Sequence, residues 1–147
     1  MKRDTYSGTK GGTTLETTRI RGTAMEKKRI LIADDDESFL KGLAIRLRAL
    51  HFDVITAKSG CEALKKATRH RPDVIITDIN MPGGDGFTIQ ERLGHLNWGP
   101  PPIIYVTGEK SGRMETRLWQ HDARDVLFKP LDTQELLLTV DDMLTAS

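Results

Sequence analysis

Short apolar runs alternate with stretches of helical periodicity along the chain from residue 29 onward. The apolar runs have the length and the Ile and Val content of buried strands in a parallel sheet. They occupy residues 30–33, 53–57, 74–77, 103–107 and 126–128. Apolar residues at three- and four-residue spacing predict a helix after each run, over residues 38–50, 60–69, 87–95, 112–121 and from 132 to the C-terminal end. Five strand-then-helix units with short connections predict a doubly wound three-layer α/β sandwich with a five-stranded parallel sheet.

Two helix starts and one weak helix refine this prediction. Ser59 followed by Glu62 forms a capping box at the second helix, and Asp132 caps the last one. The fourth helix has few strong apolar positions, and we expect it to be mobile or to face a partner. Within it, Met114 is expected in the core, whereas Trp119 fits core packing and a partner surface equally well.

Polar side chains stand where four of the five apolar runs end. Asp34 and Asp35 follow the first run, and Asp78 follows the third. Thr107 ends the fourth run and Lys129 follows the fifth. The carboxyl ends of parallel strands meet at one edge of a doubly wound sheet, where such folds hold their ligands. We therefore expect these side chains to line one pocket.

Each of these residues taken alone has a simpler explanation. Residues 34–37 are all acidic and could simply complement the dipole at a helix N-terminus. Asp78 could begin a turn, Thr107 could end a strand, and Lys129 could be solvated. Because four strands end in such polar residues at equivalent positions, one shared functional site is favoured over four independent simple explanations.

The residue types in this set suit phosphoryl transfer. Three converging carboxylates repel one another unless a cation neutralises them, and a site with few carboxylates and room for phosphate oxygens suits Mg²⁺. Lys129 adds a positive point charge that pairs with phosphate, and Thr107 adds a hydroxyl donor. An aspartate carboxylate is a competent nucleophile for a phosphoryl group. The sequence thus predicts an aspartyl-phosphate site at Asp78.

In order and spacing, these residues resemble the receiver domain of two-component response regulators, of the single-domain, chemotaxis-regulator type. The resemblance spans residue 29 to about residue 144 and rests on the following positions: Asp34-Asp35, Asp78, Met81-Pro82, Asp85-Gly86, Thr107 and Lys129-Pro130. It implies a flavodoxin-like fold with strand order 2-1-3-4-5.

The resemblance also implies the roles of the site residues. Asp78 would be the phosphoacceptor, modified by a sensor histidine kinase or a histidine phosphotransfer protein, and Thr107 and Lys129 would contact the phosphoryl oxygens. Mg²⁺ would be held, directly or through water, by four groups: Asp34, Asp35, Asp78 and the backbone carbonyl of Asn80. Phosphorylation would change a surface that binds a downstream target protein.

Three further positions bear on the lifetime and output of this state. Asn80 lies two residues after Asp78, and Glu109 two after Thr107. An amide and a carboxylate there resemble receivers that dephosphorylate readily, because these groups can orient an in-line water. Val126 stands where many members carry an aromatic switch residue, and a stiff Val cannot swing as a ring does. The usual Thr–aromatic output mechanism is therefore not implied for this chain.

Composition and charge set the domain boundaries and limit the function classes. The 147 residues suffice for one domain, with 37% hydrophobic and 29% charged residues and a net charge of +1. Residues 1–28 are basic, rich in Gly and Thr and without hydrophobic period, and are expected to be a disordered extension before a receiver domain at residues 29–147. Their composition also fits a transit peptide. The single cysteine, Cys61, is expected to pack within a helix and fits a reducing cytoplasm.

The sequence points to a protein partner as the output and away from nucleic acid or membrane. The near-neutral charge gives no reason for direct nucleic-acid binding, and no apolar stretch is long enough to span a membrane. We expect a signalling phosphoacceptor that catalyses only its own phosphorylation and dephosphorylation and carries no output domain. Two alternatives remain open: a phosphatase of the haloacid-dehalogenase type, and a scaffold that acts without phosphorylation. The phosphatase would need a second Asp where Asn80 stands and a cap domain.

Overall fold

The computed structural model describes residues 27–81, 85–97, 99–121, 123 and 125–145, and strands and helices alternate through them. The strands are β1 (Arg29–Ala33), β2 (Asp53–Ala57), β3 (Val74–Asp78), β4 (Ile103–Thr107) and β5 (Val126–Phe128). The helices are α1 (Glu37–Ala49), α2 (Gly60–His70), α3 (Gly86–Leu93), α4 (Gly112–Gln120) and α5 (Thr133–Thr145). The predicted strand bounds agree with these to one residue, and those of the first four helices to two.

All five strands are parallel, and their order in the sheet is β2-β1-β3-β4-β5. This confirms the predicted fold class. Ala33 is paired with Ala57 on one side and with Thr77 on the other, and Asp78 is paired with Val106. The register therefore brings the carboxyl ends of β1, β3 and β4 to one edge of the sheet.

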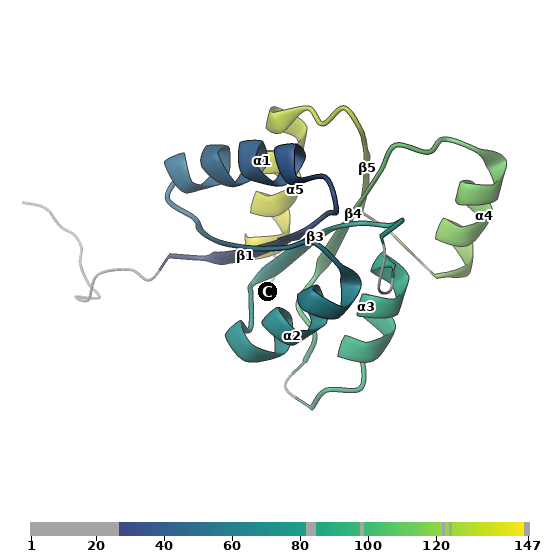
Figure 1. Ribbon diagram of the computed structural model, residues 1–147, viewed down its shortest axis with the longest axis horizontal. Helices are drawn as coiled ribbons and strands as arrows, with labels where there is room; N and C mark the ends of the chain where they lie inside the picture. Colours follow the sequence, from purple (N-terminus) through teal and green to yellow (C-terminus); the bar gives the residue numbers. More distant parts are fainter. Residues whose placement is uncertain (1–26, 82–84, 98, 122, 124, 146–147) are drawn as a thin grey trace, which may run out of the picture.

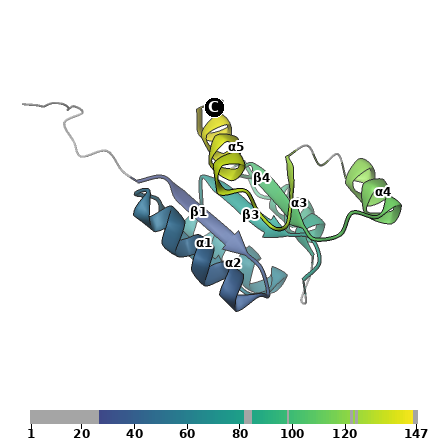
Figure 2. The same ribbon diagram turned by 90° about the horizontal axis from the view of Figure 1, so that it is seen from above.

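Helices cover both faces of the sheet (Figures 1 and 2). Helices α1 and α5 lie on one face and α2 and α3 on the other, because each face of the apolar strands needs its own cover. The α1/α5 side is the larger core. Its buried side chains come from the sheet and from both helices: Ile30, Ile32, Leu40, Leu43, Leu47, Ile76, Ile104, Leu136 and Val140 are among them.

Helix α4 is packed differently from the other four helices. Figure 1 shows it standing out at the side of the molecule, beside the β4–β5 end of the sheet. Met114 is its only buried residue and belongs to a small cluster with Ile79, Phe87 and Tyr105. Met114 is thus in the core as predicted, whereas the Trp119 side chain is 86% exposed.

Side-chain caps fix the helix starts. Ser59 accepts a hydrogen bond from the backbone N–H of Glu62 at 3.1 Å, which confirms the predicted cap. The Glu62 carboxylate returns to the N–H of Lys58, one residue before the cap, at 2.6 Å. Asp132 likewise accepts from Gln134 N–H at 2.9 Å at the start of α5.

One expectation about the helices was wrong, and one about the N-terminal residues falls outside the described part of the chain. Cys61 lies in α2 as predicted, but it is exposed rather than packed, because the inward face of that helix is taken by Ala63 and Ala67. The predicted disorder of residues 1–28 falls almost wholly outside the described residues. In the part of the chain that is described, no helix is long and apolar enough to cross a membrane.

Candidate functional site

Three aspartates gather at the carboxyl edge of the sheet. Asp34 follows β1 directly, Asp35 follows Asp34, and Asp78 is the last residue of β3. One carboxylate oxygen from each lies within 4.8 Å of the others. Asp34 is 1% exposed and Asp78 is 9% exposed, while Asp35 is exposed at the rim. The set is therefore a partly open acidic pocket, with oxygen donors of the kind that suits a hard divalent cation.

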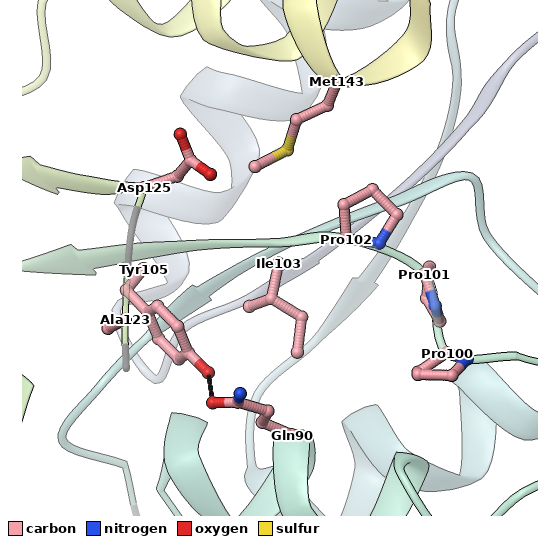
Figure 3. A pocket seen from close by; sticks show the side chains of 9 residues that line it. All are labelled: Gln90, Pro100, Pro101, Pro102, Ile103, Tyr105, Ala123, Asp125 and Met143. Atoms are coloured by element: carbon pink, nitrogen blue, oxygen red, sulfur yellow. Dashed lines mark hydrogen bonds between the residues drawn. The ribbon is translucent and has the colours of Figure 1, made fainter. Parts of the chain in front are cut away.

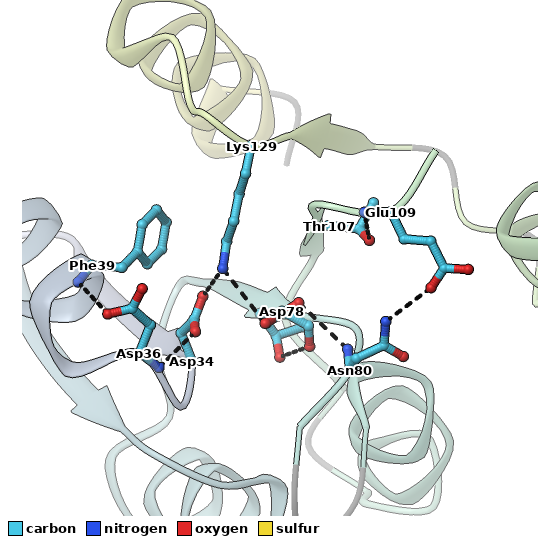
Figure 4. Close-up of polar contacts among 9 residues, drawn as sticks. Asp34, Asp36, Phe39, Asp78, Asn80, Thr107, Glu109 and Lys129 are labelled. Atoms are coloured by element: carbon cyan, nitrogen blue, oxygen red, sulfur yellow. Dashed lines mark hydrogen bonds and ion pairs between the residues drawn. The ribbon is translucent and has the colours of Figure 1, made fainter. Parts of the chain in front are cut away.

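Lys129 reaches into this pocket from the end of β5 (Figure 4). Its Nζ donates to Asp34 at 2.7 Å and lies 3.6 Å from a carboxylate oxygen of Asp78. Burial lowers the pKa of Lys129, but the hydrogen bond to Asp34 and the charge of Asp78 outweigh it and raise the pKa above its ordinary value. Lys129 is consequently a fixed positive charge between the two buried carboxylates.

The pocket also perturbs Asp78 itself. Burial raises the pKa of its carboxyl group, and the neighbouring negative charge of Asp34 raises it further. The Lys129 ammonium and the Asn80 backbone N–H, 3.4 Å from Asp78 Oδ1, oppose this rise without cancelling it. A raised pKa at a strand end in a polar cluster is typical of a functional carboxylate.

The acidic run at residues 34–37 serves two purposes. Asp36 is the N-cap of α1 and accepts from Phe39 N–H at 3.1 Å. Asp34 accepts from Asp36 N–H at 2.9 Å while its other oxygen holds Lys129. The simple explanation, a helix N-terminus rich in acids, is correct for Asp36, while Asp34 and Asp35 turn to the pocket.

Thr107, Asn80 and Glu109 lie on the side of Asp78 away from Asp34 (Figure 4). The buried Thr107 hydroxyl accepts from the backbone N–H of Glu109 at 3.0 Å. The Asn80 amide donates to the Glu109 carboxylate at 3.4 Å, and Ser111 donates to the same carboxylate at 2.6 Å. The hydrogen bond from Ser111 is the main reason that the pKa of Glu109 lies below its ordinary value.

Sequence reasoning missed Arg117, which joins α4 to this group. Its guanidinium donates to Asn80 Oδ1 at 3.1 Å and to the Asp85 carboxylate at 2.5 Å. Asp85 is in turn the N-cap of α3 and accepts from Thr88 N–H at 3.0 Å. A single arginine in a weak helix carries no pattern by which these contacts could be predicted.

Two residues shape the pocket in ways that the sequence did not predict, although Gly86 belongs to the motif on which the resemblance rests. The Phe39 ring lies 4.5 Å from Lys129 Nζ, a cation–π contact. A Cβ atom on Gly86 would lie 3.0 Å from the backbone oxygen of Asp78 and 3.1 Å from the Thr77 methyl group. Glycine therefore lets the start of α3 press against the end of β3.

The departure at Val126 leaves a half-buried aliphatic side chain at that position. Val126 packs against the small cluster of Ile79, Phe87, Tyr105 and Met114. The aromatic residue on β5 is Phe128 instead, which is 38% exposed and lies under Lys110 Nζ, 5.1 Å from the ring centre.

A second hollow, of about 260 Å³, lies at the other end of β4 (Figure 3). Pro102 and Ile103 line it where the strand begins, and Met143 of α5 closes one side. The Tyr105 hydroxyl donates to Gln90 at its wall, and burial raises the pKa of that hydroxyl. It is separate from the acidic pocket, since parallel strands place Asp78 and Thr107 at the opposite edge.

Comparisons with known proteins agree with this geometry. The model of the response regulator receiver domain matches residues 30–141. The transcriptional regulatory protein PrrA of Mycobacterium tuberculosis is 35% identical over 122 residues, which are 83% of this chain and 52% of PrrA. The chain thus spans about half the length of this relative.

Solved structures of response regulators are also similar to this chain. The chemotaxis response regulator CheY4 of Vibrio cholerae is similar with a TM-score of 0.72 and 32% identity, covering 81% of this chain and all of that one. A CheX-CheY-BeF3-Mg complex from Borrelia burgdorferi matches with a TM-score of 0.67 and 27% identity, over 77% of this chain and 86% of that one. The chain therefore belongs to the response regulator receiver domain family.

Proposed function

We propose that residues 29–147 form a receiver domain in which Asp78 accepts a phosphoryl group from a histidine kinase or a histidine phosphotransfer protein. The observation that carries the proposal is the meeting of three carboxylates within 4.8 Å with one ammonium held between two of them. Paired acids and a lysine at a strand edge favour a charged, metal-assisted transfer over binding of a neutral ligand.

The transfer itself follows from these positions. A carboxylate oxygen of Asp78 forms a bond to phosphorus, and the donor's bond to phosphorus breaks, leaving its electron pair on the donor. Lys129 and the Thr107 hydroxyl contact the phosphoryl oxygens. In the unmodified chain Lys129 already spans Asp34 and Asp78, so it stands where the incoming negative charge arrives.

The donor set fits Mg²⁺. Asp34, Asp35 and Asp78, with the backbone carbonyl of Asn80, would hold the ion, and it would neutralise charge on the phosphoryl oxygens. The related complex from Borrelia burgdorferi contains Mg and BeF3, and we transfer this binding to the present chain as part of the proposal.

We further propose that the phosphorylated state is short-lived and is read by a protein partner. Asn80 and Glu109 stand beside Asp78, where an amide and a carboxylate can tune hydrolysis, the carboxylate by orienting the attacking water. The exposed Trp119 supplies a large apolar surface on α4, and large aromatic side chains are frequent anchors of protein contacts. Phosphorylation adds charge beneath the β4–α4 loop and so biases this surface.

Acetyl phosphate labelling tests the central claim. The chain is incubated with acetyl phosphate, with and without Mg²⁺, and resolved on a Phos-tag gel. We expect a shifted band that requires Mg²⁺ and disappears in Asp78→Asn, while the exposed α5 variant Asp141→Asn keeps it. A shift that survives in Asp78→Asn would refute the assignment of the phosphoacceptor.

The same preparation separates the alternatives. Continuous turnover of a small phosphate monoester would favour the phosphatase, although Asn80 occupies the place of its acid/base residue. Absence of modification by acetyl phosphate and by a phosphorylated histidine donor would favour a scaffold that acts without phosphorylation.

A further inference from the structure

Arg117 connects a helix at the edge of the molecule to a residue beside the phosphorylation pocket. Its guanidinium donates to Asn80 Oδ1 at 3.1 Å and to Asp85 at 2.5 Å, and it lies 5.2 Å from the centre of the Phe87 ring. The arginine and aspartate side chains are 30% and 29% exposed. Three contacts on one planar group hold the guanidinium in a single place.

These contacts determine which way the Asn80 amide faces. A guanidinium can only donate, so the atom of Asn80 that meets Arg117 is the carbonyl oxygen. A carboxylate can only accept, so the atom that meets Glu109 is the NH₂ group, at 3.4 Å. The two charged neighbours therefore fix the amide orientation, with its hydrogen-bond acceptor turned toward α4.

Hydrolysis of an aspartyl phosphate needs such an acceptor. The water oxygen forms a bond to phosphorus, the bond from phosphorus to the Asp78 oxygen breaks, and its electron pair returns to the carboxylate. A water proton leaves to phosphate or solvent, and inorganic phosphate is released. The attacking water is best oriented by a group that accepts one of its hydrogens. With the Asn80 carbonyl held by Arg117, Glu109 is the acceptor left in this network, and it already accepts from Ser111.

We propose that Arg117 is a positioning residue that slows dephosphorylation by keeping the Asn80 carbonyl away from the attacking water. The proposal rests on the proposed function and deepens it. It makes the lifetime of the phosphorylated state depend on where α4 sits, because Arg117 belongs to that helix. A partner that displaced α4 or engaged Arg117 would thereby change the rate at which the signal decays.

The decay of phosphorylated protein tests this. Each variant is labelled with acetyl phosphate and Mg²⁺, desalted, and followed over time on Phos-tag gels. We expect Arg117→Ala to decay about fivefold faster than the parent chain, the scale set by freeing one hydrogen-bonding group. Arg117→Lys keeps the charge but cannot hold Asn80 and Asp85 together, and is expected to fall between the two.

Two controls isolate the route through Asn80. In an Asn80→Ala background, Arg117→Ala should have no further effect, whereas a general loosening of α4 would accelerate decay in both backgrounds. Arg92→Ala, an exposed arginine on the neighbouring α3, should leave the rate unchanged. An unchanged or slower decay in Arg117→Ala, or an acceleration that persists without Asn80, would overturn the proposal.

A measurement without phosphorylation keeps this inference separate from the proposed function. In the unmodified chain, Arg117→Ala should move the NMR chemical shifts of the Asn80 side-chain NH₂ group toward those of a free amide. If the parent chain cannot be labelled at all, the proposed function fails while this readout still reports on the amide. If labelling succeeds but the Asn80 resonances are the same in Arg117→Ala and in the parent chain, only the positioning role of Arg117 is refuted.

Discussion

Helices α1 and α4 both border the acidic pocket, yet they are attached to the molecule by different forces. Helix α1 buries Leu40, Leu43, Ala44 and Leu47 against the sheet. Helix α4 buries only Met114 and packs Leu118 partly against the same cluster. It is also attached by the Arg117–Asp85 ion pair and by His121, whose ring centroid lies 4.1 Å from that of Phe87. Apolar burial contributes strongly to the free energy of folding and does not depend on nearby charges. Partly exposed ion pairs contribute little, and their contribution changes when nearby charges change.

The difference separates a fixed side of the site from an adjustable one. The side that supplies Asp34 and holds Lys129 rests on the large α1/α5 core. The side that supplies Asn80 and Glu109 is tied to α4 by polar contacts from Arg117 and from the N-cap residue Ser111. The carboxylate oxygens of the first side are thus held in place by the core, whereas the polar groups of the second side can shift without unfolding the domain.

Truncating one leucine on each helix is the strongest way to test this contrast. Leu47 of α1 is 0% exposed, so Leu47→Ala should lower the free energy of unfolding by about 3 kcal/mol through lost burial and a cavity. Leu118 of α4 is only partly buried, and Leu118→Ala should lower it by about 1 kcal/mol. Urea denaturation followed by circular dichroism measures both, and equal losses would remove the distinction.

Amide hydrogen exchange sharpens the same comparison without mutation. Because α4 has little buried surface, its amides should open locally with a free energy about 2 kcal/mol below that of α1, or about thirtyfold faster exchange. Helix α5, which buries Leu136 and Val140, should behave like α1. Protection of α4 equal to that of α1 would show that its polar contacts suffice to fix it.

A smaller effect is expected where α4 is tied to α3. Asp85→Ala removes both the N-cap of α3 and the partner of Arg117, and should cost about 1 kcal/mol of stability. Asp85→Asn keeps a capping oxygen and loses the charge, so its cost should be about 0.5 kcal/mol or less. Denaturation of the two variants side by side separates cap from ion pair, and a larger loss in Asp85→Asn would contradict this account.

The contrast between the two helices also explains which features of the fold and the site could be predicted from the sequence. The strand bounds, the parallel sheet and the gathering of the polar residues at strand ends follow from the apolar runs and the residues that end them. The position of Met114 in the core followed in the same way. The order of the strands was implied by the family resemblance. These features belong to regular elements whose neighbours are fixed by topology.

What could not be predicted depends on side chains that meet across loops. Nothing in the spacing of Arg117 and Asn80, 37 residues apart, indicates that they are hydrogen-bonded. Phe39 reads as one apolar position of a helix, although its ring also lies beside Lys129. The exposure of Cys61 was missed for a related reason, because a small residue fits either face of a helix until the packing of α2 on the sheet is known.

The smallest expected effect concerns Asp78, which lies beside Asp34 and Lys129 of the fixed side. Its pKa is raised above the ordinary 3.8, chiefly by burial and then by Asp34, so the ionised form costs stability in the metal-free chain. In EDTA at pH 7, Asp78→Asn should therefore be slightly more stable than the parent chain. The gain should be smaller than the loss from a core truncation, because Lys129 offsets part of the penalty.

The difference in stability should depend on pH. As the pH falls through the raised pKa, the Asp78 carboxylate is protonated in the folded chain before it is protonated in the unfolded chain. The gap between variant and parent should shrink there and vanish below the ordinary value. Urea midpoints measured from pH 7 to pH 3 check the sign. A gap that widens on acidification would mean that the folded state favours the ionised form of Asp78, contrary to the penalty that burial and Asp34 impose on it.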